Sequence, residues 1–80
     1  MIFKEKLSNQ MSQAIKSNST TKEREGVAAH HEMSIHTLNS VINMQRNITV
    51  DNSKALTELI GICVKNAYEN ATSLVNYSRG

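Results

Sequence analysis

Three histidines and one cysteine are the residues of this chain best suited to bind a metal ion or to act as a nucleophile. The histidines lie close together, at His30, His31 and His36. A helical zinc site of the protease type needs two histidines four residues apart, so that both rings face one ion. His31 and His36 are five residues apart, and His30 and His36 are six apart. This spacing predicts no metal site.

The remaining residues give no sign of catalysis. Cys63 falls on the apolar side of an expected helix, where burial keeps a thiol unreactive. The glycines stand alone at Gly26, Gly61 and Gly80, so a glycine-rich phosphate loop is absent from the sequence. We therefore expect a protein that is not an enzyme, with no catalytic residues, no cofactor and no metal.

The elements that carry these residues are all expected to be helices. The chain of 80 residues has no proline, and its apolar residues recur every three or four positions. These features predict a single all-α domain over residues 1–80. A short helix is expected at about 2–16, followed by two long amphipathic helices at about 21–46 and 53–77.

The expected helix ends follow from residues that form caps. The hydroxyls and amides of Ser17–Thr21 favour the end of the first helix. Thr20 and Glu23 have the spacing of a capping box that begins the second helix. Residues 47–53 are either a connection or a weakened part of one continuous helix, and we favour the connection. Three residues there are suited to cap the third helix: Asp51, Asn52 and Ser53.

The apolar stripes of the two long helices predict self-association. A helix of 25 residues is about 37 Å long, and one short helix cannot cover two stripes of that length. We therefore expect a helical hairpin or bundle that is completed by a homo-oligomer. The expected oligomer interface consists of Ile35, Leu38, Ile42, Leu56, Ile60, Val64 and Leu74.

The first helix is the expected surface for a different protein. Residues 1–25 contain five basic and three acidic side chains, whereas the rest of the chain is neutral. An amphipathic helix binds a partner through anchors on one face. The expected partner-binding residues are Phe3, Leu7, Met11 and Ile15.

These features favour a small interaction module that modulates or inhibits a host or viral target protein in stoichiometric amounts. In size and in its lack of catalytic residues, the chain resembles the small modulators that phages and mobile elements encode, such as those for anti-defence or lysis timing. A single cysteine and the lack of an apolar run of about 20 residues favour a cytoplasmic protein without a membrane span.

Two other functions remain open. The first is a small nucleic-acid-binding transcriptional regulator, in which Asn39, Asn43 and Gln45 would read adenine edges. The net charge is only +2, and the helix expected at 21–46 is long and neutral, whereas the reading helix of a helix-turn-helix is short and follows a tight turn. We therefore rank nucleic-acid binding second.

The other open function is an amphipathic surface-coating protein. The segments Ala55–Leu59 and Asn66–Ala71 have an Ala/Leu/Asn pattern, common in long helices, that is similar to the amphipathic repeats of granule-coating phasins. This resemblance implies a helix that covers a lipid or polymer surface.

Overall fold

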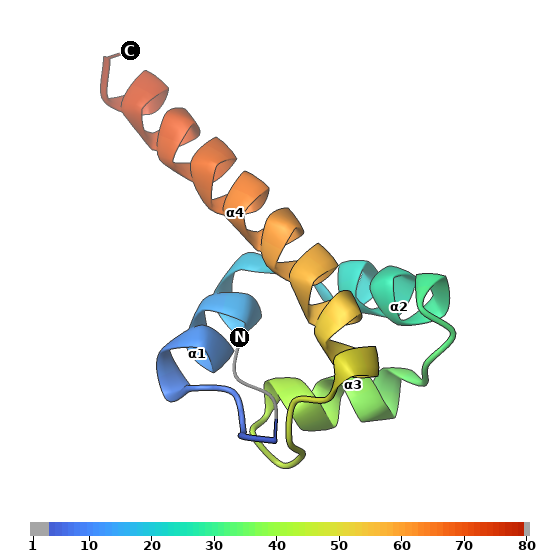
Figure 1. Ribbon diagram of the computed structural model, residues 1–80. Helices are drawn as coiled ribbons and strands as arrows, with labels where there is room; N and C mark the ends of the chain where they lie inside the picture. Colours follow the sequence, from blue (N-terminus) through green and yellow to red (C-terminus); the bar gives the residue numbers. More distant parts are fainter. Residues whose placement is uncertain (1–3, 80) are drawn as a thin grey trace.

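The computed structural model describes residues 4–79 of the protein, with side chains over residues 4–72. This part of the chain forms four α-helices and no strand, which confirms the all-α class. The helices are α1 (Asn9–Asn18), α2 (Thr21–His30), α3 (Ile35–Ile42) and α4 (Val50–Arg79). Helices α1, α2 and α3 surround the first half of α4, and the second half of α4 projects away from them (Figure 1).

The hydrophobic core lies between the three short helices and the first half of α4. Each helix contributes apolar side chains to it, and so does Ile48 of the connection before α4. The buried apolar residues are Leu7, Ile15, Val27, Ala28, Leu38, Val41, Ile42, Ile48, Ala55, Leu56, Leu59 and Cys63. The core therefore forms within one copy of the chain.

Helix α1 begins later than the sequence predicts. The side chain of Ser8 accepts a hydrogen bond from the N–H of Met11 at 3.2 Å and so caps a helix that starts at Asn9. The chain before Ser8 is held by Ile48, whose carbonyl accepts from the N–H of Lys4 at 2.9 Å and whose N–H donates to the carbonyl of Glu5 at 2.8 Å. Residues 2 and 3 of the expected helix lie outside the described residues.

The single helix expected at 21–46 is two helices, α2 and α3. Glu32 has a φ of 53°, in the left-handed region that ends helices. Its N–H donates to the carbonyl of Ala29 at 3.1 Å, and the N–H of Met33 donates to that of Ala28 at 2.9 Å. These two bonds form a Schellman motif, which ends α2 and turns the chain.

The residues after this turn begin a new helix. The Ser34 hydroxyl accepts a hydrogen bond from the N–H of Thr37 at 3.0 Å, so Ser34 is the N-cap of α3. The three-and-four spacing of apolar residues hides the break, because Ala28, Leu38 and Ile42 are all buried in one core although they come from two helices. The cap-forming Ser34 directly before Ile35 is the sequence signal that would have located it.

Helix α3 ends in the same way as α2. Met44 has a φ of 62°, and its N–H donates to the carbonyl of Val41 at 3.1 Å. The N–H of Gln45 donates to the carbonyl of Ser40 at 2.8 Å, which completes a second Schellman motif. Both motifs place a residue with a side chain where glycine is usual, so glycine does not mark either turn in the sequence.

Two reciprocal caps fix the starts of α2 and α4. The predicted capping box is confirmed at α2, where the Glu23 carboxylate accepts from the Thr20 N–H at 2.9 Å and the Thr20 hydroxyl accepts from the Glu23 N–H at 3.1 Å. Thr49 and Asn52 make the equivalent pair at α4, at 2.8 and 3.2 Å. Helix α4 therefore begins at Val50, three residues before the predicted start, because Thr49 is the cap and Asn52 supports it from the first turn.

Candidate nucleic-acid interface

Helix α2, the turn at residues 31–34 and helix α3 form a helix-turn-helix. The two helices have ten and eight residues. One reason for ranking nucleic-acid binding second was the long helix expected at 21–46, and the structure has in its place a short helix that follows a tight turn. The net charge of +2 and the lack of Asp, Glu, Lys and Arg in α3 are unchanged by this finding.

Buried side chains on both helices hold the helix-turn-helix together. Val27 and Ala28 of α2 are each 2% exposed, and Leu38 and Val41 of α3 are fully buried. The N-terminal half of α4 covers the same core, where Leu56 is fully buried. This packing uses the apolar side of α3 and leaves its other side to solvent.

The solvent side of α3 carries polar groups. His36 and Asn43 are exposed, while Asn39 and Ser40 are half-buried. The Ser40 hydroxyl donates to the carbonyl of His36 at 2.9 Å, so it is already paired within the helix. Helix α3 contains no Asp, Glu, Lys or Arg. The amides of Asn39 in α3 and of Asn43, the C-cap residue directly after it, are thus the groups on this surface that match the donor and acceptor pattern of an adenine edge.

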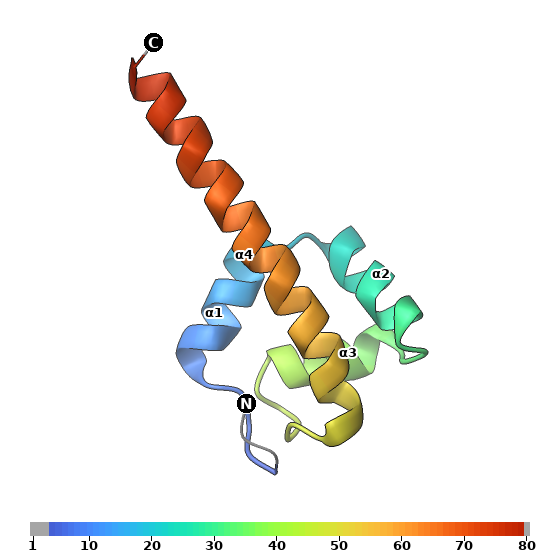
Figure 2. The same cartoon turned by 45° about the horizontal axis from the view of Figure 1, so that its top comes forward.

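Helix α3 lies at the end of the molecule opposite the projecting part of α4, and both views show this arrangement (Figure 2). The molecule measures 46 × 24 × 16 Å, so its two ends are well separated. A nucleic acid bound along α3 would therefore lie far from the C-terminal part of α4.

Basic residues from two other segments lie near α3. Arg46 and Lys54 line one surface hollow together with Thr37 of α3, and Glu32 and Asp51 line the same hollow.

Lys4 is held beside the connection that follows α3, through the backbone hydrogen bond to Ile48. Basic groups at such positions suit contacts to phosphates on either side of a groove.

The basic residues of the first third of the chain do not all lie near α3. Lys16 and Lys22 are exposed near the end of α1 and the start of α2. That junction packs against the middle of α4, where the Asn66 amide donates to the carbonyl of Asn18 at 2.8 Å and to the Glu23 carboxylate at 3.1 Å. The sequence did not single out Arg46 or Lys54, because their proximity to α3 depends on the turn after it.

The expected oligomer-interface residues are divided between core and surface. Three are buried within the single chain (Leu38, Ile42 and Leu56), two are half-buried against the same core (Ile35 and Ile60), and Val64 is 64% exposed. The Leu74 side chain lies outside the described residues. The reason is the break at 31–34, because it folds α2 and α3 onto α4 and covers within one copy the apolar surface that was expected between copies.

The expected partner-binding residues of the first helix are also mostly internal. Leu7 and Ile15 are buried in the core, and Met11 is 37% exposed. Phe3 lies outside the described residues. Helix α1 therefore uses its apolar face to close the fold, and Met11 is the described member of the set that reaches the surface.

Cys63 is buried, as expected for a structural cysteine. Its thiol donates to the carbonyl of Ile15 at 3.9 Å. Burial raises the pKa of this thiol, because the charged thiolate loses its hydration there. The thiol is therefore in its unreactive, protonated form at neutral pH.

Comparison of the chain with known protein families, with curated proteins and with solved structures finds no match. None of the helices within the described residues is both long enough and apolar enough to cross a membrane.

Proposed function

We propose that the protein binds double-stranded DNA with sequence preference and places α3 in the major groove. The observation that carries this proposal is the short polar helix α3, which follows α2 after a four-residue turn and has its apolar side buried. In a helix-turn-helix the second helix contacts base edges and the first helix crosses the phosphate backbone. The second of the sequence interpretations is thus the one that the geometry favours.

Asn39 and Asn43 are the proposed base-reading residues. An asparagine amide can donate to and accept from the N6 and N7 atoms of adenine, and each such pair contributes about 1–3 kcal/mol of discrimination. His36 is exposed and lies one helical turn before Ser40. Its ring would contact the neighbouring base or phosphate. Lys4, Arg46 and Lys54 are the proposed phosphate contacts.

Binding is expected to depend only modestly on salt. The net charge is +2, and α3 itself has no charged side chain. With about three phosphate contacts per chain, the slope of log affinity against log salt concentration should be about −3 per bound chain. Sequence preference should therefore come mainly from α3 and less from general attraction to DNA.

Selection from a pool of random DNA duplexes tests the proposal. The full chain should enrich a defined motif, and fluorescence anisotropy on that motif then gives the affinity. Asn39→Ala should weaken binding by about 5–150-fold, equivalent to 1–3 kcal/mol, and relax the preference at one base position. Asn70→Ala, on the exposed surface of α4, is the matched control and should bind like wild type. Failure to enrich any motif would refute the proposal.

The basic residues are tested separately from the base-reading ones. Arg46→Ala should weaken binding to all sequences alike and reduce the salt slope by about one unit. Lys65→Ala removes an exposed positive charge from α4 and should leave both quantities unchanged. An equal effect of the two substitutions would show that only the net charge matters.

We also propose that two copies associate through α4. Dimers of helix-turn-helix proteins bind two half-sites, and one helix-turn-helix is present in the described residues of each copy. Val64 and Tyr68 lie one turn apart on a face of α4 beside the one that covers the core, and they are 64% and 74% exposed. Met11 and Ala67 line a shallow apolar hollow with Val64, and a second copy would cover it.

Sedimentation at increasing protein concentration tests this association. The wild-type chain should form a dimer at micromolar concentration, and Val64→Asp should shift the equilibrium toward single copies. Lys65→Asp, on a neighbouring exposed position, is the control and should dimerise like wild type. If the wild-type chain sediments as a single copy at high micromolar concentration, the association is refuted, and the selected DNA motif should then lack two-fold symmetry.

Modulation of a host or viral target protein stays a prediction. The exposed apolar residues of α4 are the described surface on which such a target would compete with a second copy. Competition would appear as a loss of dimer when the target is added, so the two proposals can be separated by the same sedimentation experiment.

A further inference from the structure

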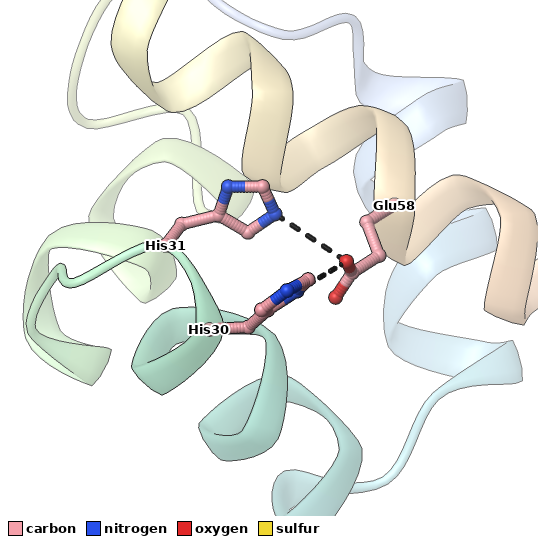
Figure 3. A group of neighbouring side chains, drawn as sticks. All are labelled: His30, His31 and Glu58. Atoms are coloured by element: carbon pink, nitrogen blue, oxygen red, sulfur yellow. Dashed lines mark hydrogen bonds and ion pairs between the residues drawn. The ribbon is translucent and has the colours of Figure 1, made fainter.

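Two histidines and a glutamate from different helices meet at the junction of α2 and α4 (Figure 3). His30 is the last residue of α2, His31 is its C-cap, and Glu58 lies in α4. The His30 Nδ1 is 2.7 Å from the Glu58 Oε1, and the His31 Nε2 is 3.5 Å from the same oxygen. The three candidate ligand atoms all lie within 4.8 Å of one another.

The His31 ring has an unmet requirement at this point. Its Nε2 is buried and has no hydrogen-bond partner, because the 3.5 Å separation from Glu58 is too long for a well-formed bond. Buried polar atoms without a partner are uncommon, since each one has lost its contact with water. A ligand between His31 and Glu58 would satisfy this nitrogen.

The donor set is the one that transition metals prefer. Imidazole nitrogen and carboxylate oxygen bind Zn²⁺ at about 2.0–2.2 Å, so neighbouring ligand atoms of a tetrahedral ion lie about 3.3 Å apart. The two separations from the Glu58 oxygen, 2.7 and 3.5 Å, are on either side of that value. The two imidazole nitrogens lie within 4.8 Å of each other, so side-chain rotations that bring them closer would place all three atoms around one ion.

The charge state and the exposure of the cluster suit the same role. The hydrogen bond from His30 lowers the pKa of the Glu58 carboxyl, which keeps it in the ionised form that a metal requires. The side chain of His30 is 70% exposed, whereas those of His31 and Glu58 are 23% and 34% exposed. An ion held here would have an open side where water completes the coordination.

We propose that His30, His31 and Glu58 bind a divalent transition-metal ion such as Zn²⁺. His30 would bind through Nδ1, His31 through Nε2 and Glu58 through one carboxylate oxygen. The ion would join the end of α2 to α4 and so fix the turn that orients α3. The proposal stands apart from DNA binding, since the three residues lie outside α3.

Titration of the full chain with Zn²⁺ by calorimetry, without DNA, is the direct test. We expect one ion per chain, and with Co²⁺ in place of Zn²⁺ we expect the visible absorption of a tetrahedral site. His31→Gln and Glu58→Gln should each weaken binding by at least about 10–100-fold, since loss of even an outer-shell partner has that effect. The thermal midpoint should rise with Zn²⁺ for wild type and stay constant for Glu58→Gln.

The control variants distinguish this cluster from surface histidine in general. His36→Gln removes an exposed histidine of α3, and Glu69→Gln removes an exposed carboxylate of α4, so both should bind Zn²⁺ like wild type. Circular dichroism should show that every variant is folded. If wild type does not bind Zn²⁺, or if His36→Gln weakens binding as much as His31→Gln, the proposed site is refuted, whatever the result with DNA.

Discussion

The two halves of α4 have opposite surroundings. Up to Asn66 the helix is covered by α1, α2 and α3, and its Ala55, Leu56 and Leu59 are fully buried. Beyond Asn66 every residue from 67 to 72 is exposed, and the helix continues to Arg79 (Figure 1). One regular helix therefore serves first as part of a core and then as a free extension.

This difference shows where the fold is stabilised and where a partner is needed. Isolated helices shorter than about 12–15 residues are only marginally stable in water. Residues 67–72 of the extension are all exposed, Tyr68 among them, so this segment gains little stability from packing within one copy. A second copy on this surface would provide the missing contacts, which supports the proposed dimer.

The strongest test of this difference replaces one buried residue of the core and one exposed residue of the extension. Leu38→Ala removes a fully buried side chain and should lower the free energy of unfolding by about 2–5 kcal/mol. Tyr68→Ala affects a side chain of the extension that is 74% exposed and should change it by less than about 0.5 kcal/mol when the chain is dilute. Urea denaturation measures both, and equal losses would contradict the division between core and extension.

A buried hydroxyl in α1 gives the next largest expected effect. The Ser12 hydroxyl donates to the carbonyl of Ile42 at 2.6 Å and joins α1 to the end of α3. Ser12→Ala should cost about 1–3 kcal/mol, because the carbonyl loses its partner in a buried place. Ser17→Ala, on the exposed side of the same helix, should change the unfolding free energy little. Thermal unfolding measures the stability of both variants, and equal losses would contradict the role given to the Ser12 hydroxyl.

The left-handed turn between α2 and α3 should be improved by glycine. Glu32 has a φ of 53°, which costs a residue with a Cβ roughly 1–2 kcal/mol. Glu32→Gly should therefore raise stability by about 1 kcal/mol, although glycine usually destabilises. Glu25→Gly, in the middle of α2, should lower it by about 1 kcal/mol. If both substitutions destabilise, the turn at Glu32 is not as described.

The smallest expected effect is a pH dependence at the boundary between the two halves. Hydrogen bonds from the Thr20 backbone and then from the Asn66 amide lower the pKa of Glu23 below its ordinary value of 4.5. Because the folded pKa is the lower one, the stabilisation is present above the ordinary value and is lost as the pH falls through the lowered value.

The difference in unfolding free energy between wild type and Glu23→Gln should therefore be largest near neutral pH and should shrink below about pH 4.5. Unfolding curves at a series of pH values measure this difference. Glu25→Gln is the control, since Glu25 makes no side-chain hydrogen bond in the described part of the chain. A difference that does not depend on pH would contradict the role given to Glu23.

The sequence was sufficient for the parts of the fold that depend on neighbouring residues. Apolar spacing predicted helices, and the Thr20–Glu23 pair predicted the start of α2, because capping acts over three residues. The break at 31–34 was missed, since Glu32 and Met44 occupy positions where glycine is the usual signal.

The proposed functional residues depend on contacts over longer distances. Glu58 is 27 positions from His31, and only the packing of α4 on α2 brings them together. In the same way, α3 became a candidate reading helix only once the turn before it was known. Local spacing could identify Asn39 and Asn43 as groups able to read bases, but their place on a short helix came from the fold.

The helix that completes the core is made after the three short helices. Leu38, Val41 and Ile42 leave the ribosome before Leu56, Leu59 and Cys63, which later cover the same core. Until then the apolar side chains that the three short helices bury against α4 are uncovered, and an exposed apolar face of this kind favours aggregation or proteolysis. A messenger that ends early, anywhere before the codon for Cys63, should therefore yield a product that the cell degrades, while one that loses only the extension should still yield a folded domain.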